Sequence, residues 1–97
     1  MTHAFHNYSQ FRNLPKTQVV FPKTGVEATL EVCEPDPHNT AVIASRVTWG
    51  IKITKRGLAG CLVTGFKWFR EDGTPVEEGS ILQGRMVDNA LRLLNQQ

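Results

Sequence analysis

Six basic residues and no acidic residue lie between His38 and Arg70, and this local charge is the strongest chemical signal in the chain. The whole chain has a net charge of only +2, so the remaining residues carry a net charge of −4. A local excess of cations attracts phosphate groups or an acidic protein surface even where the overall charge is slight. The cations in this stretch are Arg46, Lys52, Lys55, Arg56, Lys67 and Arg70.

The same stretch predicts two neighbouring antiparallel strands. In residues 43–54 the apolar residues occupy nearly every second position, which is typical of a half-buried strand. Residues 61–69 form the returning strand, which is richer in apolar residues. Gly57 suits the first central position of a two-residue type II′ turn, so we expect a tight hairpin.

A two-residue turn at Gly57 and Leu58 fixes which side chains share a face. One face is then apolar and aromatic, and we expect it to form the core, while the other face is basic and points outward. A slip of one residue would mix tryptophans and lysines on one side. The core-face pairs are Val47–Trp68, Trp49–Phe66, Ile51–Thr64 and Ile53–Leu62, and the basic-face pairs are Arg46–Phe69, Thr48–Lys67, Gly50–Gly65 and Lys52–Val63.

The basic face predicts a small non-enzymatic protein that binds single-stranded DNA or RNA. Its cations would contact phosphates, Thr48 would donate a hydrogen bond, and Phe69 would stack under a base. Single-strand binders combine a positive groove with aromatic platforms in this way. The predicted binding residues are Arg46, Thr48, Lys52, Lys55, Arg56, Lys67 and Phe69.

The same face fits two alternatives. It could belong to a protein-interaction module, such as a small inhibitor or adaptor, that docks on an acidic patch of a larger protein through Arg and Phe anchors. It could also be a solvated sheet face, since basic residues on exposed strands protect against aggregation. An outward face or an unpaired edge strand could further mediate a homodimer.

No other group of residues predicts catalysis, a metal site or a cofactor. The three histidines and two cysteines lack the spacing of a zinc site. Cys33 and His38 are separated by two prolines, and no third group is placed to orient them as nucleophile and base. We therefore expect no enzyme activity, no metal and no cofactor.

Sequence composition also predicts where the protein works. No apolar run approaches the length of a membrane span, so we expect no membrane partner. The first eleven residues lack the apolar segment of a secretory signal. We expect a cytoplasmic protein with two reduced thiols.

The residues before the hairpin predict two further strands in a single domain that spans residues 1–97. A short apolar run at 18–21 and strict alternation over 26–32 indicate these strands. Residues 1–16 carry little periodicity, and we expect them to form a loosely ordered arm.

The residues after the hairpin predict a C-terminal helix over 81–95, where apolar residues recur at helical spacing. Residues 74–79 fit either a fifth short strand or the first turn of that helix. The expected fold is α+β, a four- to five-stranded antiparallel meander with one C-terminal helix packed on one face.

Overall fold

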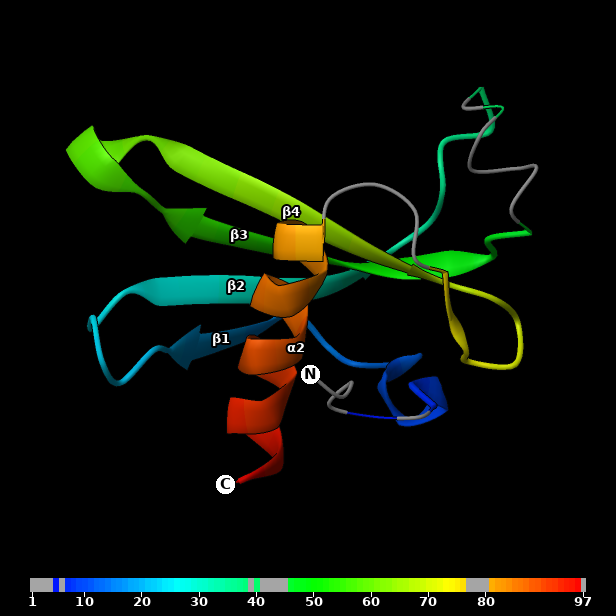
Figure 1. Ribbon diagram of the computed structural model, residues 1–97, viewed down its shortest axis with the longest axis horizontal. Coiled ribbons are helices and arrows are strands. Elements are labelled where there is room, and N and C mark those ends of the chain that lie inside the picture. Colours follow the sequence, from blue (N-terminus) through cyan, green and yellow to red (C-terminus); the bar gives the residue numbers. More distant parts are fainter. Residues whose placement is uncertain (1–4, 6, 39, 41–45, 77–80, 97) are drawn as a thin grey trace.

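The computed structural model describes residues 5, 7–38, 40, 46–76 and 81–96, and it contains one five-stranded antiparallel sheet with a helix on one face (Figure 1). The strands lie in chain order: β1 (Thr17–Val20), β2 (Glu27–Cys33), β3 (Trp49–Arg56), β4 (Leu62–Phe69) and β5 (Pro75–Val76). Helix α2 spans Ile81–Asn95. The predicted α+β meander is confirmed, and Pro75–Val76 is a fifth strand.

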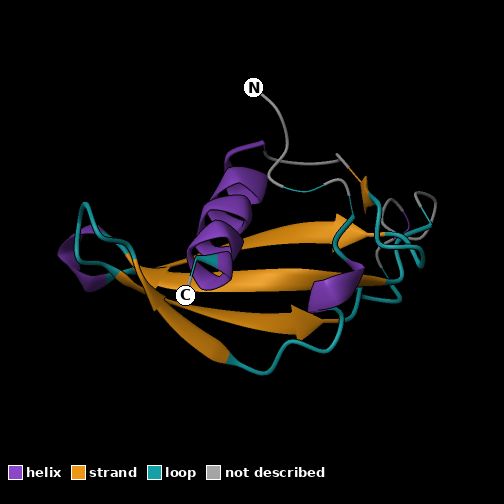
Figure 2. Ribbon diagram, turned by 90° about the horizontal axis from the view of Figure 1, so that it is seen from below, coloured by secondary structure: helices purple, strands orange, loops and turns teal. Residues whose placement is uncertain are grey.

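Helix α2 covers only one face of the sheet, as Figure 2 shows. Val87, Ala90 and Leu91 follow one another at helical spacing and are fully buried against that face. They meet the apolar residues at alternating positions of the strands, so that each element buries its one apolar side. We call the covered side of the sheet the helix face.

The N-terminal segment packs against the helix face as well. Tyr8 is fully buried and Phe11 nearly so, beside the short 3₁₀ turn Ser9–Phe11. The Tyr8 N–H donates a hydrogen bond of 2.9 Å to the Gly73 carbonyl. The described part of this segment is therefore anchored to the core, whereas the sequence predicted a loosely ordered arm.

The register predicted for the β3–β4 hairpin is wrong. Arg56 pairs with Leu62, so the loop contains five residues instead of two, and the Gly57 N–H donates to the Cys61 carbonyl across it. Ala59 and Gly60 both have positive φ, at 60° and 77°, which turns the chain back. Three additional loop residues are an odd number, so every side chain of β4 lies on the opposite face from the one predicted.

The observed pairing defines the second face of the sheet, which we call the outer face. On the helix face Trp49 pairs with Phe69, Ile51 with Lys67, Ile53 with Gly65 and Lys55 with Val63. The outer face carries Gln18 and Val20 of β1, Glu27, Thr29, Glu31 and Cys33 of β2, Gly50, Lys52, Thr54 and Arg56 of β3, and Leu62, Thr64, Phe66 and Trp68 of β4. The predicted pair of facing glycines does not form, because Gly50 lies opposite Trp68.

Strand β3 also begins later than predicted. It starts at Trp49, and Arg46 lies before it in a turn with φ of 62°. Residues 43–45, which the prediction placed in the strand, lie outside the described residues. The Thr48 N–H donates to the Phe69 carbonyl at 2.9 Å, which closes the open end of the hairpin.

Candidate functional site

The residues predicted to form one basic surface do not lie together. Two of them are buried on the helix face, one lies at the rim of that face, two are on the outer face, and two precede β3 at the opposite end of the hairpin from its loop. The buried pair is Lys67 and Phe69, the rim residue is Lys55, the outer-face pair is Lys52 and Arg56, and the residues before β3 are Arg46 and Thr48.

Lys67 is part of a buried ionic network that fastens the helix to the sheet. Its Nζ lies 3.0 Å from Asp88 Oδ2 of α2, and its side chain is only 9% exposed. The Tyr8 hydroxyl donates to the other carboxylate oxygen of Asp88 at 2.5 Å. Lys67 Nζ also lies 5.2 Å from the centre of the Tyr8 ring. With its charge paired inside the core, Lys67 is not placed to contact a phosphate, contrary to prediction.

Phe69 is likewise a core residue instead of a stacking platform. It is fully buried, and its ring stacks on Trp49 with centroids 4.4 Å apart. The Tyr8 ring lies 4.6 Å away on another side. These three aromatic rings fill the space beneath the N-terminal segment, and a base has no access to them.

The aromatic residues that face outward are Phe66 and Trp68, which the sequence predicted as core. Both are partly exposed on the outer face, and their rings are parallel within 4° with centroids 5.4 Å apart. The six-membered ring of Trp68 lies directly over Gly50, so a Cβ at that position would overlap it. Glycine therefore allows the indole to lie flat across the neighbouring strand.

Two exposed apolar side chains lie on the same face, at the end of the sheet that carries the β3–β4 loop. Val20 on β1 is 54% exposed and Leu62 on β4 is 66% exposed. Single exposed apolar residues are ordinary, but a partly exposed aromatic pair on an uncovered sheet face is typical of binding surfaces. Of the residues predicted to bind, only Lys52 and Arg56 share this face.

The charge of the outer face is mixed, although the sequence of its central hairpin contains no acid. Strand β2 brings Glu31 opposite Lys52, and Lys52 Nζ lies 3.9 Å from Glu31 Oε1. Glu27 is exposed on the same strand. Arg56 bonds weakly to the Gly60 carbonyl at 3.4 Å and keeps its charge accessible. The outer face thus presents cations and anions side by side.

Cys33 adds a thiol to this face without adding a nucleophile. Partial burial raises the pKa of Cys33 to about 11, an effect that the nearby Lys52 charge opposes and the Glu31 carboxylate reinforces. The thiol is therefore protonated at neutral pH, and a protonated thiol attacks electrophiles poorly.

Within the described ranges, no three His, Cys, Asp or Glu side chains gather as they would around a metal ion. No helix of these ranges is long and apolar enough to cross a membrane. Comparison of the chain with protein families, with curated proteins and with solved structures found no match.

Proposed function

We propose that this chain is a small non-enzymatic binding protein whose outer face docks on another protein. The observation that carries the proposal is the parallel Phe66–Trp68 pair, which points away from the core and is only partly exposed. Tryptophan, tyrosine and arginine are enriched among the residues that dominate binding energy at protein interfaces. Trp68 and Phe66 supply an aromatic anchor, while Leu62 and Val20 add exposed apolar area at the other end of the same face.

The charges of the outer face favour a protein over a nucleic-acid backbone. Affinity for a phosphate chain grows with the number of phosphates that cations neutralise. On this face Glu31 already pairs with Lys52, and Glu27 lies on the same strand, so a phosphate row would meet carboxylates. A protein partner that offers an apolar pocket for Trp68, an acidic group for Arg56 and a basic group for Glu31 complements the face better.

Affinity purification from the native cells tests this proposal with a pair of neighbouring substitutions. Leu62→Asp places a charge on the outer face. Val63→Asp places the same charge on the next residue, which is also exposed but belongs to the helix face. One defined protein should co-elute with the unmodified chain and with Val63→Asp, and its yield should fall about tenfold or more with Leu62→Asp. Equal recovery with both variants would contradict docking on the outer face.

Single-stranded nucleic acid is the second candidate ligand, and the aromatic pair beside Lys52 favours it. Stacking of a base on an aromatic side chain contributes about 1–3 kcal/mol. Under this alternative, a fluorescein-labelled oligonucleotide should bind at low salt, and its affinity should fall steeply as salt is added. Nuclease treatment before purification separates the two candidates, since a protein partner stays bound only if nucleic acid is not the bridge.

A further inference from the structure

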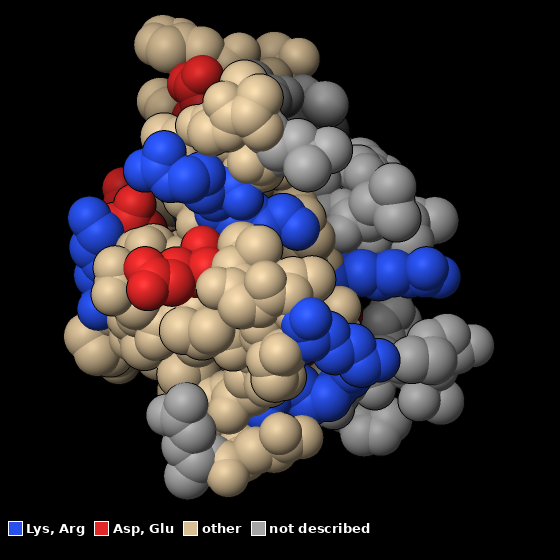
Figure 3. Space-filling model, turned by 90° about the vertical axis from the view of Figure 1, so that its left-hand side faces the viewer, with Lys and Arg blue, Asp and Glu red and all other residues tan. Residues whose placement is uncertain are grey.

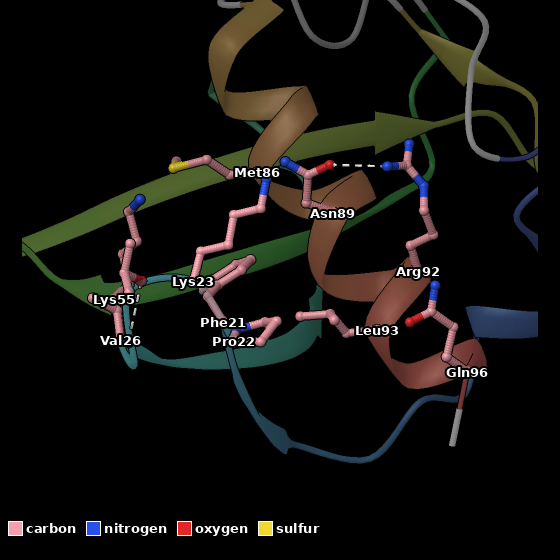
Figure 4. A pocket seen from close by; sticks show the side chains of 11 residues that line it. Phe21, Pro22, Lys23, Val26, Lys55, Met86, Asn89, Arg92, Leu93 and Gln96 are labelled. Carbon is pink, nitrogen blue, oxygen red and sulfur yellow. Dashed lines mark hydrogen bonds between the residues drawn. The ribbon is translucent and has the colours of Figure 1, made fainter.

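A pocket of about 530 Å³ lies between the β1–β2 turn and the C-terminal half of α2, on the helix-face side of the molecule (Figure 4). Its volume falls in the range of about 300–1,000 Å³ that is usual for small-molecule sites. The pocket is separated from the outer face by the sheet. Any ligand it holds is therefore independent of the proposed docking function.

The floor of the pocket is apolar. Phe21 and Val26 enter from the two sides of the β1–β2 turn, and Met86 and Leu93 come from the helix opposite. Phe21 and Met86 also pack on the hydrophobic core, which holds this wall in place. Figure 4 shows Leu93 of the helix directed toward Phe21 and Pro22 of the turn. Such a floor accommodates an aliphatic chain or a ring.

Three cations from three different elements also line this pocket: Lys23 from the turn, Lys55 from β3 and Arg92 from α2. No Asp or Glu is among the described lining residues, and none of the three cations forms an ion pair within the described ranges. Lys55 Nζ lies 5.9 Å from the centre of the Phe21 ring, at the edge of the apolar floor. Arg92 Nη1 donates to Asn89 Oδ1 at 3.3 Å, which orients its guanidinium.

The three pocket cations differ from Lys52 and Lys67 in their ion pairing. Lys67 and Lys52 each have a carboxylate partner, whereas the three pocket cations have none in the described ranges. Figure 3 shows the end of the molecule that carries the β1–β2 turn and the β3–β4 loop, where Lys and Arg side chains flank an uncharged area and outweigh the acids. An anion that enters here would meet unneutralised positive charge beside an apolar surface.

We propose that this pocket binds a small amphiphilic anion, with its apolar body on Phe21, Met86 and Leu93 and its anionic head among Lys23, Lys55 and Arg92. The guanidinium of Arg92 matches a carboxylate in two parallel hydrogen bonds, and the two lysines add point charges. A medium-chain fatty carboxylate is the simplest molecule with both properties. A neutral alcohol of the same length fits the floor but not the cations.

Titration of the ¹⁵N-labelled protein with decanoate, below the concentration at which it forms micelles, tests the proposal. Amide signals of residues 21, 23–26 and 86–96 should shift in a saturable way, and those of the outer-face residues Thr54 and Thr64 should not. Decanol has the same chain without the charge, and its affinity should be lower than that of decanoate by a factor of about ten or more. Equal affinity for decanol, or shifts that never saturate, would overturn the proposal.

The triple variant Lys23→Gln, Lys55→Gln, Arg92→Gln supplies the second arm. All three side chains reach the surface, so the dispersed amide spectrum of the folded protein should persist. Decanoate affinity should fall about tenfold or more, while the weak decanol binding should stay unchanged. Lys16→Gln removes an exposed cation that does not line the pocket and should leave decanoate binding intact. An unchanged decanoate affinity in the triple variant would refute a role for the cations.

Discussion

Trp68 occupies its place on the outer face only because residue 50 has no side chain. We expect Gly50→Ala to displace the indole and to destabilise the protein by about 1–3 kcal/mol, the usual cost of forcing an extra methyl group into a packed position. Urea denaturation measures the loss of stability. Iodide quenching of tryptophan fluorescence should increase, and the increase reports on Trp68 because Trp49 stays buried. Thr54→Ala, on the same strand and face, should change the free energy of unfolding by less than about 0.5 kcal/mol and should leave the iodide quenching unchanged.

The thiol of Cys33 should be slow to react because burial raises its pKa to about 11 from a value near 9. At pH 8 this lowers the thiolate fraction about 100-fold, so iodoacetamide should modify the exposed Cys61 well before Cys33. Mass spectrometry of the alkylated peptides measures both rates. The rate at Cys33 should rise about tenfold for each pH unit up to pH 11. Equal rates for the two thiols in the folded protein at pH 8 would contradict this expectation.

The raised pKa of Cys33 also makes the free energy of unfolding depend on pH. Because the folded state holds the proton more tightly than the unfolded chain, the contribution of Cys33 to stability is complete below the unfolded pKa and is lost as the pH rises from about 9 to about 11. Cys33→Ser should therefore flatten the fall in unfolding free energy over this interval. For the alkylation experiment, the reference rate comes from the urea-denatured protein, in which both thiols are exposed.

At the scale of elements, the contact between α2 and β4 includes one buried ion pair. Lys67→Met leaves the Asp88 carboxylate with only the Tyr8 hydroxyl, and we expect a loss of about 3–5 kcal/mol, as is usual when a buried charge loses its partner. The double variant Lys67→Met, Asp88→Asn removes both charges and keeps an acceptor for Tyr8, so it should be more stable than the single variant. Urea denaturation measures both.

The exposed ion pair of the outer face is the matched control for this comparison. Glu31→Gln removes the partner of Lys52, where both side chains are more than a third exposed, and we expect a change below about 1 kcal/mol. A similar cost for Lys67→Met would show that the buried network does not fasten the helix. A double variant no more stable than Lys67→Met would show that the unpaired Asp88 charge is not the cause.

The elements themselves were predictable, but the register of the central hairpin was not. Alternation in β2 and helical spacing in α2 fixed their faces, and the helix begins and ends where the pattern predicted. Strand β4 is apolar on both faces, so no pattern chose between its two orientations. The choice then rested on Gly57, while the loop is in fact closed by Ala59 and Gly60 at positive φ. A positive φ at alanine has no signature in sequence.

The candidate site was only partly predictable for the same reason. The basic stretch is real, but neighbours in space supply carboxylates that the stretch lacks: Asp88 from the helix and Glu31 from β2. The position of Glu31 could be predicted, because it lies on the polar side of an alternating strand and therefore shares the outer face. The burial of Lys67 was not available, because it depends on which residue of α2 lies above it.

At the scale of the whole molecule, the outer face and the pocket are separate surfaces with different charge. The outer face presents cations and anions together, and the pocket presents cations alone. Binding of a protein to the outer face should therefore depend weakly on salt, whereas binding of decanoate should weaken as salt screens the pocket. Affinities measured at about 50 and 300 mM salt compare the two surfaces directly.

Neutralising Glu31 separates the two candidate ligands of the outer face, because they predict opposite signs. Glu31→Gln frees Lys52 and makes this face more positive, so affinity for a single-stranded oligonucleotide should rise if phosphates are recognised there. If a protein with complementary charges docks instead, the partner loses its acidic counterpart and its affinity should fall several-fold. Glu71→Gln removes the same charge from an exposed ion pair with Arg12 outside the outer face, and it should affect neither ligand. Fluorescence anisotropy with the oligonucleotide and with the co-purified protein measures both signs. A rise for the oligonucleotide together with an unchanged protein affinity would assign the outer face to nucleic acid.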